Sequence, residues 1–203
     1  MNPPTNSLWM RRAVVAVLLA VLMICGALLY RLYERSFGGG ISTEALIGGP
    51  FELTDQNGNQ VTEQTYKGKL MLVYFGFTFC PDACPTALGI MSAAIDKLDV
   101  AADRVVPIFI TVDPDRDTPQ VMKDYVSNFN PRLVGLTGTP EQIAKAAKAY
   151  RVFYQKAPGT TPGEYLMDHT TLMYLMDGEG KYVTHFGPDA TPEQMADEIR
   201  KHL

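Results

Sequence analysis

The chain has 203 residues, with 18 Lys and Arg, 22 Asp and Glu and a formal net charge of −4. This length accommodates one membrane anchor and one ordinary domain, and it excludes two large domains. Hydrophobic residues make up 46% of the chain and charged residues 20%, which excludes a disordered chain and a multi-span membrane protein. Three cysteines are too few for a disulfide-stapled scaffold, so we expect them to have a chemical rather than a structural role.

The charge is distributed unevenly along the chain. Residues 1–36 carry a net charge of +3, whereas residues 37–203 carry −7. Because binding to nucleic-acid phosphates requires clustered Lys and Arg, the acidic part of the chain excludes a nucleic-acid-binding function.

An uncharged run of eighteen residues extends from Ala13 to Tyr30. As a helix this run would be roughly 27 Å long, close to the thickness of a hydrocarbon core of about 30 Å. It ends at Arg31 without the small residues of a signal-peptide cleavage site. A lipoprotein signal at Cys25 also fits poorly, because Ile24 occupies the place of a small residue. The sequence therefore predicts an uncleaved transmembrane helix.

These features divide the chain into three parts. We expect residues 1–36 to form the membrane anchor and residues 49–203 to form one folded domain. Residues 37–48 include three consecutive glycines, which predict a flexible tether. Two arginines precede the apolar run and two follow it, so the positive-inside rule leaves the orientation of the anchor open.

The first half of the domain alternates between β-type and helical patterns. Residues 51–62 contain two β-prone runs around Asn57-Gly58, which predicts a β-hairpin. Residues 69–77 and 105–112 are continuous apolar runs, typical of strands that are buried on both faces. Between them, apolar residues recur at helical spacing, namely Leu88, Met91, Ile95 and Leu98.

Three later helices are predicted by the same start signal. Thr118, Thr139 and Thr191 each precede a proline, and a threonine cap followed by proline is typical of a helix N-terminus. Gln142 and Gln194 complete a capping box in the last two. Further strands are predicted at residues 133–136, 152–155, 171–176 and 181–187. Strands that alternate with helices indicate an α/β domain with a central sheet.

Cys80 and Cys84 lie four residues apart, after a predicted buried strand and at the start of a helix. A helix N-terminus lowers the pKa of a thiol and favours the thiolate, which is both a nucleophile and a soft metal ligand. On a regular helix such a pair has Cβ atoms about 5–6 Å apart, which is wide for a relaxed disulfide. A metal ion bonded to both sulfurs would span this gap, whereas a disulfide would require the first turn to open, as Pro81 could allow.

A third metal ligand would have to come from one of three histidines. His202 is the penultimate residue, and His185 lies within a predicted strand. His169 lies at the entrance to the strand predicted at 171–176, and neighbouring strand ends could bring it toward the cysteine loop. A structural role for this histidine is the alternative. Two thiolates and one imidazole favour Cu(I), although zinc with a fourth ligand and a structural disulfide remain alternatives.

Residues 112–119 have the sequence VDPDRDTP, whose carboxylates at 113, 115 and 117 resemble the start of an EF-hand loop. Thr118 replaces the glycine of that loop, and Asp124 replaces its final glutamate. We therefore expect a strand-to-helix turn in which Thr118 caps the helix and Arg116 pairs with a neighbouring carboxylate.

Three motifs follow one another along the chain: FGFTFCPDACP, VDPDRDTP and YLMDHTTLMYLM. With these motifs residues 49–203 resemble the Sco/SenC family of copper-binding proteins of cytochrome c oxidase assembly. The chain departs from many members at Phe79, where they carry His, but that position is not a known ligand in the family.

The resemblance implies a thioredoxin-like fold, shared with peroxiredoxins, in which a central mixed sheet is flanked by helices. It implies that Cys80, Cys84 and His169 bind copper. It also implies a single-pass anchor in a bacterial cytoplasmic membrane, with the domain in the periplasm. The expected client is the binuclear copper site of cytochrome c oxidase subunit II. Another periplasmic copper chaperone or a thioredoxin-like reductant is expected as a further partner.

Three functions are therefore considered. A metallochaperone would use all three ligands to carry copper. A thiol–disulfide reductase would use Cys80 and Cys84 as catalytic residues on the client's cysteine pair, although thioredoxin-type enzymes carry CxxC rather than CxxxC. A peroxidase is less consistent with the sequence, because peroxiredoxins have Thr three residues before the Cys, whereas Thr78 is two before Cys80.

Overall fold

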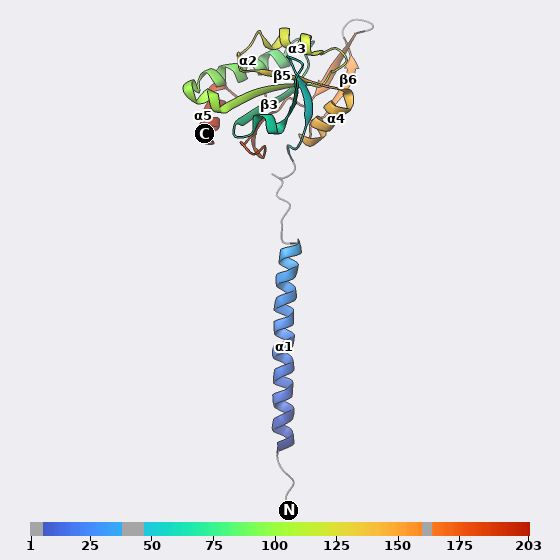
Figure 1. Ribbon diagram of the computed structural model, residues 1–203, viewed down its shortest axis with the longest axis vertical. Coiled ribbons are helices and arrows are strands. Elements are labelled where there is room, and N and C mark those ends of the chain that lie inside the picture. The colour runs from blue at the N-terminus through green and yellow to red at the C-terminus, as the bar shows by residue number, and fades with distance from the viewer. Residues whose placement is uncertain (1–5, 38–46, 160–163) are drawn as a thin grey trace, which may run out of the picture. The chain divides into compact units, whose positions relative to one another are not determined.

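The computed structural model describes residues 6–37, 47–159 and 164–203, which form two compact units (Figure 1). The first unit contains helix α1 (Asn6–Phe37), and the second is the domain that ends at Leu203. Most of the predicted tether, residues 38–46, lies outside the described residues.

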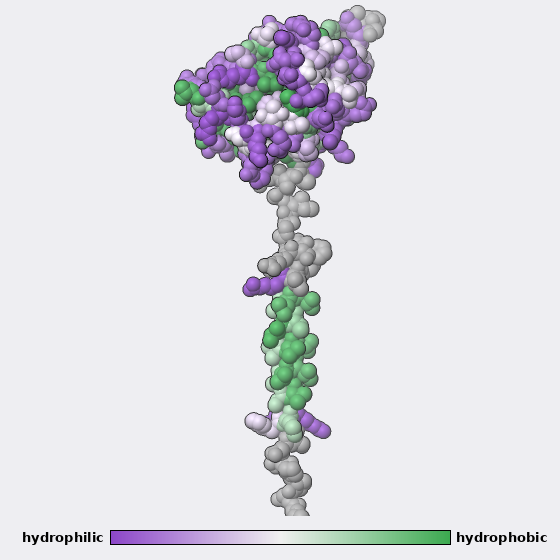
Figure 2. Space-filling model, viewed as in Figure 1, coloured by the Kyte–Doolittle hydropathy of each residue, from purple (hydrophilic) through white to green (hydrophobic). Residues whose placement is uncertain are grey.

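Helix α1 contains a stretch, Trp9–Arg31, that is long and apolar enough to cross a membrane. Its mean hydropathy is 2.8, and its surface is hydrophobic along most of its length (Figure 2). The helix therefore fits the predicted single-pass span by length and composition.

The domain is built on a mixed seven-stranded sheet with the order β2-β1-β5-β4-β3-β8-β9. Strands β3, β4 and β5 are parallel, and the remaining pairings are antiparallel. The strands are β1 (Glu52–Asp55), β2 (Gln60–Thr62), β3 (Leu70–Gly76), β4 (Val105–Thr111), β5 (Val134–Thr137), β8 (Met173–Met176) and β9 (Tyr182–Phe186). The hairpin around Asn57-Gly58 and both long buried strands are as predicted.

Helices cover both faces of this sheet. Tyr74 of β3 contacts Cys84 in α2 (Ala83–Asp96), whereas the adjacent Phe75 contacts Tyr150 at the end of α4 (Pro140–Ala149). Since adjacent side chains of a strand point to opposite faces, α2 and α4 lie on opposite sides of the sheet. Helix α3 (Pro119–Val126) packs beside β5, and α5 (Pro192–Arg200) packs against α2.

The predicted helix starts are confirmed. Thr118, Thr139 and Thr191 are the N-caps of α3, α4 and α5, and each side-chain oxygen accepts a hydrogen bond from a backbone N–H in the first turn. Both predicted capping boxes are present. Two short 3₁₀ helices, η2 (Glu63–Tyr66) and η3 (Asp99–Arg104), were not predicted.

A second sheet has two strands and does not pair with the central sheet. It pairs β6 (Tyr154–Pro158) with β7 (Tyr165–His169) in antiparallel register. Strand β7 was not predicted, and it places His169 at the end of a hairpin strand rather than at the start of β8.

Candidate metal centre

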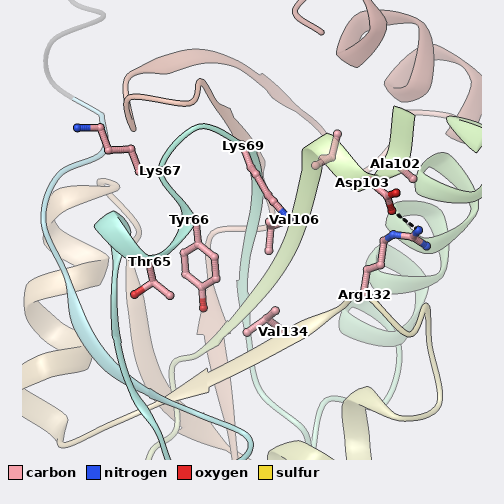
Figure 3. Close-up of a pocket in the computed structure, with 10 residues that line it drawn as sticks. Thr65, Tyr66, Lys67, Lys69, Ala102, Asp103, Val106, Arg132 and Val134 are labelled. Carbon is pink, nitrogen blue, oxygen red and sulfur yellow. Dashed lines mark hydrogen bonds and ion pairs between the residues drawn. The ribbon is translucent and has the colours of Figure 1, made fainter. Parts of the chain in front are cut away.

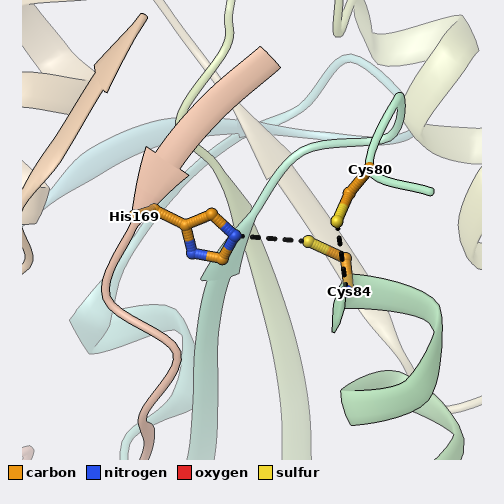
Figure 4. Close-up of side chains that lie close together, drawn as sticks. All are labelled: Cys80, Cys84 and His169. Carbon is orange, nitrogen blue, oxygen red and sulfur yellow. Dashed lines mark hydrogen bonds between the residues drawn. The ribbon is translucent and has the colours of Figure 1, made fainter. Parts of the chain in front are cut away.

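Three elements bring the predicted ligands together. Cys80 lies in the loop that follows β3, Cys84 lies in the first turn of α2, and His169 is the last residue of β7. One ligand atom from each lies within 4.8 Å of the other two, and the three side chains point toward one another (Figure 4). The structure therefore confirms the predicted convergence of the imidazole and the thiols.

Cys84 is fully buried beneath the end of β3. Its Sγ lies 3.5 Å from Nε2 of His169 and 4.0 Å from the hydroxyl of Tyr74, which donates to it. A Cβ atom at Gly76 would lie only 2.6 Å from this sulfur. A glycine at the end of β3 is therefore required for Cys84 to approach the sheet so closely.

The two thiols have opposite acid–base properties. The Sγ atom of Cys80 accepts a hydrogen bond of 3.3 Å from the backbone N–H of Cys84. Hydrogen bonding from the Cys84 thiol, opposed by burial, lowers the pKa of Cys80 to about 4. The same sulfur pair and burial raise the pKa of Cys84. Near neutral pH these opposite shifts favour the thiolate at Cys80 and the thiol at Cys84, a difference that the sequence alone did not reveal.

His169 is oriented by its other ring nitrogen. Nδ1 lies 3.0 Å from the carbonyl oxygen of Thr170 and donates to it, which leaves the Nε2 lone pair facing Cys84. The rings of Tyr74 and Phe77 pack edge-on against the imidazole, with centroids 6.0 and 5.9 Å away. The imidazole is thus fixed in the tautomer and orientation of a metal ligand.

The cysteine loop is tied to the adjacent turn by the buried carboxylate of Asp117. Thr78 donates to it from its backbone N–H, at 3.0 Å, and from its hydroxyl, at 2.6 Å. Thr111, at the end of β4, donates a third hydrogen bond of 2.5 Å. Sequence reasoning missed this anchoring role, because a carboxylate in a turn motif gives no sign of which distant residue it binds.

The three carboxylates of the 112–119 turn have three different partners. Asp113 pairs with Arg116, as predicted, and Asp115 pairs with Lys156 at 2.8 Å. Asp117 binds the cysteine loop. The segment is the predicted strand-to-helix turn.

The other two histidines lie elsewhere. His185 is exposed and forms a hydrogen bond with the hydroxyl of Tyr182, and His202 lies near Glu198 at the C-terminus. Among the described residues, Cys80, Cys84 and His169 form the group of His, Cys, Asp and Glu side chains that could hold a metal ion.

A separate hollow of about 370 Å³ lies at the opposite end of the parallel strands (Figure 3). Basic side chains, the ring of Tyr66 and valine side chains are among the groups that line it. None of its lining residues is a cysteine or histidine, so it offers no soft ligand. Its lining consists of Thr65, Tyr66, Lys67, Lys69, Ala102, Asp103, Val105, Val106, Arg132 and Val134.

Two sulfurs and one imidazole nitrogen form a soft donor set of the kind that suits copper. The helices on both faces of a mixed sheet and a cysteine pair at the start of α2 define a thioredoxin-like domain with a site for soft-metal or thiol chemistry.

The comparison with protein families specifies this class further. The SCO1/SenC family model matches residues 40–203, and the chain belongs to the SCO1/SenC family. A SCO2-like protein of Rickettsia conorii is 39% identical over 92% of this chain and 93% of its own length. Protein sco1 of Schizosaccharomyces pombe is 49% identical over 75% of this chain. The match covers 59% of that relative's length.

Solved structures agree with this assignment. ScoI of Bradyrhizobium japonicum with copper bound is 50% identical, with a TM-score of 0.72, over 77% of this chain and 99% of that structure. ScoI of Arabidopsis thaliana with copper bound is 45% identical, with a TM-score of 0.73, over 77% of this chain and 97% of that structure. The thioredoxin-like fold expected from the sequence is therefore confirmed, and copper is the metal found in these relatives.

Proposed function

We propose that this protein is a membrane-anchored copper metallochaperone that holds copper through Cys80, Cys84 and His169. The observation that carries the proposal is the convergence of three soft ligand atoms within 4.8 Å of one another. Copper bound to similar relatives supports the choice of metal. Membership of the SCO1/SenC family, whose copper-binding proteins the sequence resembles, supports a role in cytochrome c oxidase assembly.

The differing exposure of the ligands suits transfer of the metal. Cys80 is partly exposed in a loop, whereas Cys84 is buried. A thiolate of a partner protein would therefore displace Cys80 first, while Cys84 and His169 still hold the ion. Stepwise ligand exchange of this kind avoids releasing free copper.

Competition with a chromophoric Cu(I) chelator tests the ligand set on the full chain in detergent. We expect one tight site in the reduced protein and a loss of at least tenfold in affinity in His169→Ala, because a trigonal site becomes a two-sulfur site. His185→Ala is the matched control and should bind as the parent does. Unchanged affinity in His169→Ala would show that the third ligand is wrongly assigned.

We further propose that the client is the binuclear copper site of cytochrome c oxidase subunit II and that the domain faces the periplasm of a bacterium. The similar length of the Rickettsia relative and the apolar helix α1 support a bacterial protein with an N-terminal anchor. Alkaline phosphatase fused after Leu203 should be active in cells, because that enzyme requires export. A reporter that is active only in the cytoplasm would reverse the proposed orientation.

A thiol–disulfide reductase is the second candidate function. It is favoured by the lowered pKa of Cys80, which supplies an accessible thiolate next to a buried thiol. The Cys80 thiolate would attack a client disulfide and form a mixed disulfide. The Cys84 thiol would then lose its proton and attack Cys80, which releases the client as a dithiol and leaves Cys80 and Cys84 oxidised.

The same His169→Ala variant separates the two functions. Reduction of a disulfide requires both cysteines but no imidazole ligand, so we expect its rate to change little while copper affinity falls. If His169→Ala abolishes disulfide reduction but leaves copper affinity intact, His169 is not the third copper ligand, and disulfide reduction depends on it.

A further inference from the structure

Arg116 links three segments that surround the metal centre. It lies in the turn between β4 and α3, where its Nε donates to the buried carboxylate of Asp113. One terminal nitrogen donates to the backbone oxygen of Tyr165, at 3.0 Å, on the β6–β7 hairpin. Its guanidinium carbon lies 4.8 Å from the ring centroid of Phe79, the neighbour of Cys80.

The contact with the hairpin is the most extensive of these. The guanidinium carbon lies 3.8 Å from the ring centroid of Tyr165, within the range of a cation–π interaction. The hydroxyl of Tyr165 donates to Asp113 at 2.8 Å, so Arg116, Asp113 and Tyr165 form a closed set of contacts. Lys156 also lies over the Tyr165 ring, but its ion pair with Asp115 is exposed and contributes little.

The hairpin needs such a link because it is not part of the central sheet. Strands β6 and β7 form a two-stranded sheet of their own, which has no ladder of backbone hydrogen bonds to the central sheet. Side-chain contacts therefore hold the hairpin to the domain, with Met167 buried in the core. Tyr165 begins β7 and His169 ends it, about 13 Å further along the strand. Fixing Tyr165 therefore restricts where the His169 imidazole can lie.

We propose that Arg116 is a positioning residue for the metal centre: it holds the β6–β7 hairpin against the cysteine loop and so keeps His169 next to Cys80 and Cys84. This inference rests on the proposed ligand set. A lysine could supply the charge at this position, but not the planar guanidinium that donates to Asp113 and Tyr165 at once and stacks on an aromatic ring. Arg116→Lys therefore removes the positioning while it keeps the charge.

A double-mutant cycle on the full chain tests the proposal, with Cu(I) affinity measured for the parent, Arg116→Lys, His169→Ala and the double variant. Residues that orient metal ligands typically contribute 10–100-fold to affinity, and we expect a loss of that size in Arg116→Lys. In the His169→Ala background the same substitution should have almost no further effect, because the ligand it positions is gone. Additive losses would overturn the proposal, as would an unchanged affinity in Arg116→Lys.

Two further variants separate positioning from general destabilisation. Arg132→Lys makes the same change at an arginine paired with Asp103 at the far end of the strands, and it should leave copper affinity unchanged. Tyr165→Phe removes only the hydroxyl bond to Asp113, so it should lower affinity in the same direction but less, even if Arg116→Lys folds poorly. X-ray absorption should show fewer nitrogen neighbours per copper in Arg116→Lys, and retention of the full nitrogen count would contradict the inference.

Failure of the proposed ligand set and failure of the positioning role of Arg116 give different results. If His169→Ala leaves affinity unchanged, the proposed ligand set is wrong, whatever Arg116 does. If His169→Ala lowers affinity and Arg116→Lys does not, the ligand set stands and only the positioning role is overturned.

Discussion

Cys80 and Cys84 are only four residues apart, but their environments differ. Cys80 lies in a loop and receives hydrogen bonds from the first turn of α2, which stabilise its charge. Cys84 is buried below Gly76 and beside Tyr74, where a charge would be costly. The protein therefore keeps one reactive sulfur at its surface and one protected sulfur inside.

This difference predicts how alkylation depends on pH. Because the pKa of Cys80 is about 4, its thiolate fraction should remain constant from pH 8 to pH 5 and fall only as the pH approaches 4. Iodoacetamide should therefore modify Cys80 at a nearly constant rate over that range, measured by peptide mass spectrometry, with Cys84 almost unmodified. Free glutathione is the control, and its rate should fall about tenfold per pH unit. A tenfold slope at Cys80 would contradict the thiolate assignment.

Asp117 gives a second prediction at this scale. Asp117→Asn replaces one carboxylate oxygen by an N–H₂ group, which cannot accept hydrogen bonds from Thr78 or Thr111. We expect a loss of about 2 kcal/mol in the free energy of unfolding and faster hydrogen exchange at the Thr78 amide. Asp124→Asn, on the exposed surface of α3, should change neither quantity. Equal protection of the Thr78 amide in both variants would remove Asp117 as the anchor of the loop.

At the scale of elements, the site depends on how closely α2 approaches the end of β3. A Cβ atom at Gly76 would lie 2.6 Å from the Cys84 sulfur and 2.9 Å from Phe109. Gly76→Ala should therefore displace Cys84, with a cost of about 1–3 kcal/mol in stability and a lower copper affinity. The measurements are urea unfolding and chelator competition.

Gly89 offers a matched control within α2 itself. A Cβ atom there would have no neighbour within 4 Å, and alanine is the better helix former. Gly89→Ala should keep copper affinity and leave stability unchanged or slightly higher. If both alanine variants bind copper equally well, the close approach at Gly76 is not required for the site.

The elements that could be predicted from sequence are those with local signals. The Thr-Pro starts of α3, α4 and α5 and the Asn57-Gly58 turn are set by nearby residues, and all are confirmed. Strand β7 lacks such a signal, because its side chains alternate weakly in burial and its partner is β6 alone. The meeting of His169 with the cysteines was correctly expected, but the hairpin that carries the histidine was not. The roles of Asp117 and Arg116 depend on contacts 39 and 49 residues away in the chain, which spacing cannot show.

At the scale of the whole molecule, the chain enters the domain far from the metal centre. Gly48 lies against Met176, which pairs with Met71 near the start of β3, whereas the cysteine loop follows the other end of that strand. The separation along β3 is about 17 Å. The metal centre and Gly48, near the start of the domain, are thus at opposite ends of the central strands.

Because the ligands all lie in the second unit, we predict that copper binding is independent of the anchor. Residues 43–203, expressed without α1, should fold and bind Cu(I) with an affinity within about threefold of the full chain, since the ligands and their supporting contacts all lie in this unit. Chelator competition compares the two proteins directly. A much weaker site in the shorter protein would show that α1 or the tether contributes to binding.

The most direct test of the central claim is X-ray absorption at the copper edge of the Cu(I)-loaded full chain. Two sulfur neighbours and one nitrogen neighbour per copper are predicted, with the nitrogen lost in His169→Ala and one sulfur lost in Cys80→Ser. A copper ion with sulfur neighbours alone, or a nitrogen signal that persists in His169→Ala, would contradict the three-ligand site.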